Sequence, residues 1–168
     1  MNIIAQVISI CALIFFALSV QMKEKKKLLL FQLVANLLYG ISYILLDVKI
    51  AFYMNLISCL RCIILYFSKK DKPSVMFFLL ILGLILYAGI YNYEDLLSLI
   101  PIVITIIYTV STWQNNMKVI RYGFISAGVV WIFYNFIVGA YASIISNLFE
   151  IISGIIALNR NKNKERKV

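Results

Sequence analysis

The sequence contains no histidine, two prolines and only seven acidic residues among its 168 positions. Histidine is the commonest metal ligand and the commonest general base, so its absence removes the usual basis for a metal centre or for acid–base catalysis. We therefore expect no metal, no cofactor and no catalytic residue, and we expect that the protein is not an enzyme. The three cysteines, Cys11, Cys59 and Cys62, all lie inside apolar runs, where packing is their expected role.

Charge is also scarce, and this excludes a water-soluble fold. Charged residues make up 14% of the chain and hydrophobic residues 63%, with a mean hydropathy of +0.94. Soluble domains carry about 25% charged residues. The net charge of +9 could suggest a nucleic-acid partner, but 14 of the 16 basic residues lie in four short clusters between or after apolar runs. That placement indicates membrane topology, so we expect a lipid bilayer and no nucleic acid as partner.

The apolar runs predict an all-α membrane protein with seven transmembrane helices. A span needs about 20 apolar residues, within a range of about 17–25. The first run follows Asn2 directly without a basic segment, so we expect a true span rather than a signal peptide. Gly139 is the only break between the last two runs, and a turn is expected there because the joined run would be too long for one helix. The predicted spans are Ile3–Val20, Leu28–Leu46, Ile50–Phe67, Val75–Tyr91, Leu96–Trp113, Ile120–Val138 and Ala140–Leu158.

The connections between the spans predict the orientation. Alternate connections and the C-terminal tail hold 14 basic residues, whereas the other connections hold only Lys49. The positive-inside rule then places the N-terminus outside and the C-terminus in the cytoplasm. The basic clusters are Lys23 with Lys25, Lys26 and Lys27; Lys69, Lys70 and Lys72; Lys118 and Arg121; and Arg160, Lys162, Lys164, Arg166 and Lys167.

A shift of 92 residues lays the first three spans onto the last three without gaps, with 12 of 72 aligned pairs identical. The fourth span, Val75–Tyr91, has no counterpart and contains no Ser, Thr, Asn, Gln or charged residue, as expected of a helix that faces lipid or links parts. One linking helix makes the two three-helix units parallel. The sequence therefore predicts a 3+1+3 repeat, in which 1–72 is the first unit, 73–92 the link, 93–160 the second unit and 161–168 a basic cytoplasmic tail.

Polar residues inside the spans are costly in hydrocarbon, so their placement carries information. The second span presents Gln32, Asn36, Tyr39 and Tyr43 at spacings of four, three and four, which is one helical face. Such residues can simply bind helices together. The alternative hypothesis is a pair of walls around a small polar ligand.

Both halves place an aromatic residue 16 positions before an asparagine, namely Tyr39 before Asn55 and Trp131 before Asn147. Aromatic faces suit the apolar face of a sugar or a similar ring, and carboxamides suit its hydroxyl groups. These four residues are the predicted substrate-binding set.

Arg61 and Glu150 are the only charges well inside spans, and three interpretations of them stay open. They could form an intramembrane charge pair between the third and seventh spans. Glu150 could serve in proton coupling. The simplest interpretation is an Arg61 that extends to the interface and a hydrogen-bonded Glu150.

The chain as a whole resembles the YgjV-type bacterial inner-membrane proteins. The stretch from Trp131 to Gly139 (WIFYNFIVG) and the segment from Asn55 to Leu65 carry this resemblance. It implies a multi-pass protein of the bacterial inner (plasma) membrane.

More distantly, the 3+1+3 layout is similar to the SWEET and SemiSWEET sugar transporters of the PQ-loop group. Those proteins line their sugar site with a Trp and an Asn, which Trp131 and Asn147 match, with Asn55 in the first half. They also carry prolines in several pore helices, whereas only Pro101 lies in a span here, so proline-based gating is not implied.

The leading functional hypothesis is a small-molecule transporter, with a sugar as the substrate class that the resemblance implies, working by alternating access between the two units. The alternative is a non-transporting scaffold or accessory subunit. That alternative predicts a tightly packed interior without a cavity between the halves.

Overall fold

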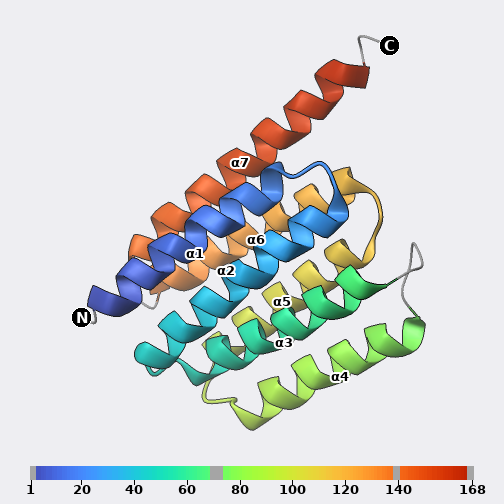
Figure 1. Ribbon diagram of the computed structural model, residues 1–168. Helices are drawn as coiled ribbons and strands as arrows, with labels where there is room; N and C mark the ends of the chain where they lie inside the picture. Colours follow the sequence, from blue (N-terminus) through green and yellow to red (C-terminus); the bar gives the residue numbers. More distant parts are fainter. Residues whose placement is uncertain (1–2, 69–73, 138–140, 166–168) are drawn as a thin grey trace.

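The computed structural model describes residues 3–68, 74–137 and 141–165, and the secondary structure of this part of the chain is helical throughout, with short connections (Figure 1). The predicted edges agree with the observed helix ends within about three residues, except that α7 runs to Glu165, seven residues beyond the predicted end at Leu158 and into the predicted tail. The elements are α1 (Ile3–Gln21), α2 (Lys25–Leu45), α3 (Lys49–Phe67), α4 (Val75–Tyr91), the 3-10 turn η1 (Leu96–Ser98), α5 (Leu99–Trp113), α6 (Met117–Ile137) and α7 (Tyr141–Glu165).

Five of the described helices are long and apolar enough to cross a membrane, namely α1, α2, α3, α6 and the η1–α5 unit from Leu96 to Trp113. The α4 helix is apolar but has 17 residues. The fold is therefore that of an all-helical protein with several membrane-compatible helices. The turn expected at Gly139 lies outside the described residues.

Local sequence explains where the helices begin and end. Asp47, between α2 and α3, has a φ of 58°, a left-handed conformation that Asp tolerates better than most residues. Before α5, the carboxylate of Asp95 accepts a hydrogen bond of 3.0 Å from the backbone N–H of Ser98, which caps η1. Pro101 lies in the first turn of α5, where a helix needs no N–H at that position, so the helix begins there without a break.

The helices run side by side, and Figure 1 shows two distinct ends of the bundle. We call one the basic end; it holds the α1–α2 and α5–α6 connections and the C-terminal end of α7. The opposite end holds the α2–α3 and α4–α5 connections and the N-terminus. Lys23, Lys118 and Arg160 lie at or beside the basic end, whereas Glu94 and Asp95 lie at the opposite end.

Six helices form a ring and the seventh lies outside it. Helices α1, α2 and α3 pack in chain order, as do α5, α6 and α7. The ring closes where α1 packs against α7 and where α3 packs against α5. Helix α4 packs against α3 and α5 and occupies one edge of the bundle in Figure 1. It buries only Ile81, Ile85, Ala88 and Gly89.

Polarity is distributed as in a protein that faces lipid. Large apolar side chains such as Ile10, Leu80 and Phe133 are exposed on the outer surface, whereas polar ones such as Gln32 and Thr109 are buried. A soluble protein shows the reverse, because water solvates polar groups at low cost. Each buried polar group here needs a partner inside the bundle.

The main apolar core lies toward the basic end. It includes Val20 at the end of α1, Leu28 at the start of α2, Trp113 at the end of α5 and Ile120 at the start of α6. A second apolar cluster joins α3, α4 and α5. The polar lining residues Tyr43 and Asn135 lie inside the ring toward the opposite end.

Arg121, which the sequence analysis counted with the connecting charges, is 0% exposed. Its Nε and Nη2 donate to the backbone carbonyls of Val20 and Met22 at 3.4 and 3.2 Å. These carbonyls end α1 and have no partner within the helix, and a cation suits the negative end of the helix dipole. Burial of a charged side chain is therefore not limited to Arg61 and Glu150, although Arg121 lies near the end of its span.

Candidate functional site

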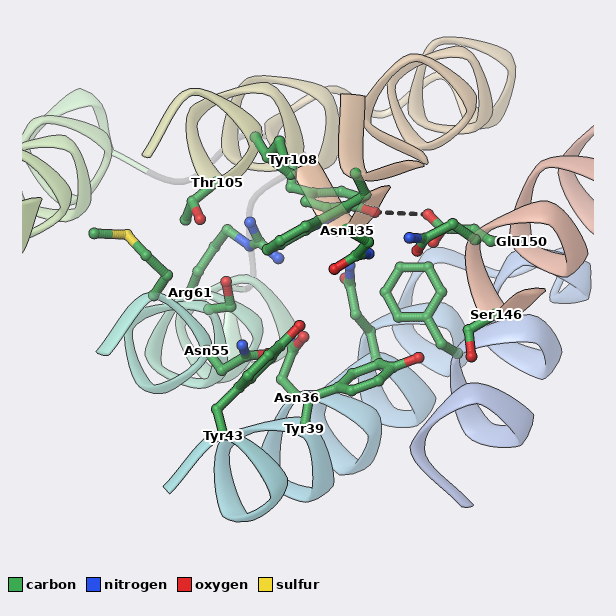
Figure 2. Close-up of a pocket in the computed structure, with 17 residues that line it drawn as sticks. Asn36, Tyr39, Tyr43, Asn55, Arg61, Thr105, Tyr108, Asn135, Ser146 and Glu150 are labelled. Carbon is green, nitrogen blue, oxygen red and sulfur yellow. Dashed lines mark hydrogen bonds between the residues drawn. The ribbon is translucent and has the colours of Figure 1, made fainter. Parts of the chain in front are cut away.

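A polar pocket lies within the ring and is open in part to the outside (Figure 2); its empty space is about 630 Å³ when the open space at its mouth is included. All six ring helices contribute to it and α4 does not. The lining residues are Phe16, Gln32, Asn36, Tyr39, Tyr43, Met54, Asn55, Ser58, Arg61, Ile104, Thr105, Tyr108, Trp131, Asn135, Ser146, Asn147 and Glu150.

All four residues of the predicted substrate-binding set and the two charges singled out from the sequence lie at this one pocket. Tyr39, Asn55, Trp131 and Asn147 all line it, and so do Arg61 and Glu150. They come from four different helices, α2, α3, α6 and α7.

The polar face of α2 explains how one wall arises. Gln32, Asn36, Tyr39 and Tyr43 recur every three or four residues, so a helix of 3.6 residues per turn presents them on one side. All four line the pocket, and Figure 2 shows Asn36, Tyr39 and Tyr43 pointing into it from the same helix.

Twelve of the seventeen lining residues form six pairs separated by 92 positions along the chain. Each pair takes one member from α1–α3 and one from α5–α7. The same separation relates the two halves of the sequence. The pairs are Phe16 with Tyr108, Tyr39 with Trp131, Tyr43 with Asn135, Met54 with Ser146, Asn55 with Asn147, and Ser58 with Glu150.

The two asparagines of the predicted binding set differ in their hydrogen bonding. The Asn55 amide nitrogen donates to the backbone carbonyl of Ala51, one turn earlier on α3, at 2.8 Å. The Asn147 amide nitrogen is buried and has no partner among the described residues. Asn147 therefore has a donor available inside the pocket.

Arg61 and Glu150 share the pocket but are not in ion-pair contact. Within the described residues the one salt bridge joins Lys27 to Glu24. Arg61 is 1% exposed, so it does not extend to the interface, and its Nη1 donates to the Thr109 hydroxyl at 3.2 Å. Of the three interpretations left open by the sequence, a direct contact between the two charges is therefore not observed.

Glu150 has a different partner. Its Oε1 accepts a hydrogen bond of 2.6 Å from the hydroxyl of Tyr108, drawn as the dashed line in Figure 2. Glu150 is 6% exposed and Tyr108 is 8% exposed, so this bond is shielded from solvent. It connects α5 to α7 across the pocket.

A cluster of aromatic rings lies on the side of the pocket toward the basic end. The rings of Phe16, Tyr108 and Phe124 contact one another, with centroids 5.2 to 5.9 Å apart. Phe16 and Tyr108 each lie five residues before the basic end of their helix, whereas Tyr43 and Asn135 lie two residues from the opposite end of theirs. We call Phe16, Tyr108 and Phe124 the aromatic plug.

The sequence analysis did not assign Tyr108, Asn135 or Phe16 to the binding set. The 92-residue shift was the signal that could have found them, because it pairs Tyr43 with Asn135 and Phe16 with Tyr108. Phe16 looked like one apolar residue among many in its span. Only the closed ring shows that it faces inward.

Comparison with known proteins gives one family. The sequence model of Imp-YgjV, described as bacterial inner membrane protein, matches residues 3–165. No curated protein and no solved structure matches the chain significantly.

Proposed function

This chain belongs to the Imp-YgjV family of bacterial inner membrane proteins, and from that premise we propose that it transports a small polar molecule by alternating access. The observation that carries the proposal is the polar pocket enclosed by the six-helix ring. Polar groups buried in a membrane bundle are costly and mark substrate or ion pathways. Midplane sites between repeated units are common in transporters.

The packing of the helices supports the 3+1+3 parallel repeat. An axis along the membrane normal would exchange α1 with α5, α2 with α6 and α3 with α7. The contact of α1 with α7 then becomes the contact of α5 with α3, and both contacts are present. Helix α4 lies outside the ring, as a link would. We therefore assign 1–72 and 93–160 to the two units and 73–92 to the link.

The six residue pairs of the pocket support the same division. A site at a two-fold repeat interface takes matching positions from both units, and 12 of 17 lining residues do so here. The proposal is that the units rock about this site, opening it in turn to each side of the membrane. The aromatic plug, which joins α1 to α5 and α6, would be the closed gate in this conformation.

The proposal includes seven spans, with the N-terminus outside and the C-terminus in the cytoplasm. The basic residues near one end of the bundle support that orientation through the positive-inside rule. The pocket then faces the periplasmic side, because its polar residues approach the opposite end and the plug lies toward the basic end.

A ring-shaped polar substrate such as a sugar fits the chemistry of the walls. Tyr39 and Trp131 offer aromatic faces, and Asn55 and Asn147 offer carboxamides. Sugars are therefore the first class of substrate to test.

A non-transporting scaffold is the second candidate function, but it accounts less well for the interior. A scaffold has no need of a pocket lined by polar side chains from five of the six ring helices. We propose a binding role for the pocket rather than a catalytic one, because the chain has no histidine to serve as a general base.

Uptake into proteoliposomes tests the proposal. The purified protein should take up at least one member of a panel of sugars and small polar metabolites. Trp131→Ala and Asn147→Ala should reduce that uptake, because both side chains line the pocket. Phe133→Ala on the same helix is the matched control, since Phe133 is 67% exposed on the outer surface. Absence of flux for the entire panel, with correctly folded protein, would contradict transport.

A further inference from the structure

Two buried donors in the pocket have no acceptor. Nε of Arg61 and the amide nitrogen of Asn147 are both without a hydrogen-bond partner among the described residues. Arg61 is 1% exposed and Asn147 is 8% exposed, and both line the pocket. In Figure 2 the Arg61 side chain extends from α3 into the space facing Tyr108 and Asn135.

Loss of a proton cannot remove the cost of burying Arg61, because an arginine guanidinium stays charged in proteins. A buried charge without a partner is one of the most costly features that a folded protein can contain. The hydrogen bond to Thr109 satisfies one N–H but brings no negative charge. Unlike Arg121, which also has an unpartnered nitrogen but lies outside the pocket, Arg61 faces a space in which an anionic group could complete its contacts.

Glu150 does not supply that group at contact distance. No ion pair joins it to Arg61, and its Oε1 is engaged by the Tyr108 hydroxyl. By the 92-residue shift, the position equivalent to Arg61 is Ser153, which contacts Gln21 outside the pocket. Arg61 therefore has no equivalent in the second unit. The two units contribute matching aromatic and amide residues to the pocket, but only the first contributes an arginine.

We propose that the pocket binds a small polar molecule through an oxyanion group, a carboxylate or a phosphate, held by Arg61 and Asn147. Binding of the anion does not depend on the proposed function. Only the consequence for transport rests on it. Nε of Arg61 would donate to one oxygen of the anion and the amide of Asn147 to another. A guanidinium matches both oxyanions in geometry and charge. Tyr39 and Trp131 would pack on the body of the same molecule.

A matched set of ligands separates this proposal from a neutral sugar site. Glucose, glucuronate, glucose 6-phosphate and glucosamine share one ring and differ in charge. We would measure the thermal unfolding of the full-length protein in lipid nanodiscs across a concentration series of each. A ligand that binds the folded state raises the unfolding temperature in a saturable way. Lactate with propane-1,2-diol gives the same comparison for a smaller molecule.

The expected result is saturable stabilisation by at least one anion and none by its neutral partner. Glucuronate or lactate acting alone identifies a carboxylate site, and glucose 6-phosphate acting alone identifies a phosphate site. Equal or stronger stabilisation by the neutral partner would overturn the proposal. So would an unfolding temperature that none of the anions changes.

Substitutions then locate the site. Arg61→Gln should weaken anion binding about 30-fold or more, because a buried charge-assisted contact is lost. Asn147→Asp should weaken it as well, because it places a like charge beside the anion. Arg121→Gln is the matched control: Arg121 is equally buried but lies outside the pocket, so the affinity should stay as in the wild type. Equal loss in both arginine variants would contradict a specific role for Arg61.

Flux measurements keep this inference distinct from the proposed function. Anion binding that depends on Arg61, without uptake into proteoliposomes, would support the site and contradict transport. Uptake of neutral sugars that is unaffected by Arg61→Gln would support transport and contradict the anion site.

Discussion

The hydroxyl of Tyr108 on α5 donates a 2.6 Å hydrogen bond to the carboxyl group of Glu150 on α7, inside the bundle. Tyr108 also belongs to the aromatic plug, through its contacts with Phe16 and Phe124. The Tyr108 side chain therefore takes part both in a hydrogen bond inside the pocket and in the ring contacts of the aromatic plug. Any movement that opens the plug would disturb this bond.

Removing this hydroxyl should destabilise the folded protein. Tyr108→Phe keeps the ring contacts but leaves the buried carboxyl group of Glu150 without its donor, which costs about 1–3 kcal/mol. Reversible unfolding in detergent micelles measures the difference. The double variant Tyr108→Phe, Glu150→Leu should recover part of the loss, because both polar partners are then replaced. A Tyr108→Phe protein as stable as the wild type would show that the bond contributes nothing.

The close approach of α5 and α6 should be sensitive to one methyl group. A Cβ at Gly123 would overlap the hydroxyl oxygen and Cβ of Ser111, which are too near their own backbone to move aside. Small residues allow membrane helices to approach closely, so Gly123→Ala should destabilise the protein by about 1–3 kcal/mol. Gly83→Ala on α4 is the control, because a Cβ there meets no atom within 4 Å. Equal unfolding free energies for both variants would contradict this packing.

The orientation can be measured with single cysteines in a background where Cys11, Cys59 and Cys62 are replaced by alanine. Glu94→Cys, exposed at the opposite end, should react with a membrane-impermeant maleimide in intact spheroplasts. Asn115→Cys, exposed at the basic end, should react only after the membrane is broken. The reversed pattern would place the C-terminus outside.

The aromatic plug should control access to the pocket from the basic end. Phe124 is 0% exposed, and Phe124→Ala removes the ring that contacts both Phe16 and Tyr108. In the background where the three native cysteines are replaced by alanine, the variant Ser58→Cys reports access to the pocket. With Phe124→Ala added, a maleimide applied to inside-out vesicles should label Ser58→Cys faster. The expected stability cost is about 3–5 kcal/mol, so the rate is measured on the folded, monodisperse fraction.

Phe133→Ala provides the control for that experiment. Phe133 lies on the same helix but is 67% exposed, so its truncation should change neither the stability nor the labelling rate appreciably. Labelling of Ser58→Cys that is equally fast with and without Phe124 would mean that the plug does not close the pocket.

Features that depend on local periodicity could be predicted from the sequence. The helices follow from the apolar runs, and the inward face of α2 follows from the spacing of Gln32, Asn36, Tyr39 and Tyr43. Both are set within a few turns of one helix. The burial of Arg121 was not predicted, because a charge near the edge of an apolar run looks like a connecting residue, whereas its burial depends on packing against the end of α1.

The sequence by itself determined that this is an all-helical membrane protein, which faces of its helices are polar, and which end of the bundle carries the basic residues. Only the tertiary structure decided that Glu150 pairs with Tyr108, and that Arg61 keeps a donor without an acceptor. The physical reason is that helical periodicity gives the direction of a side chain from its own axis. Which groups then meet depends on the rotation and depth of each helix against its neighbours, which are set by packing around the whole ring.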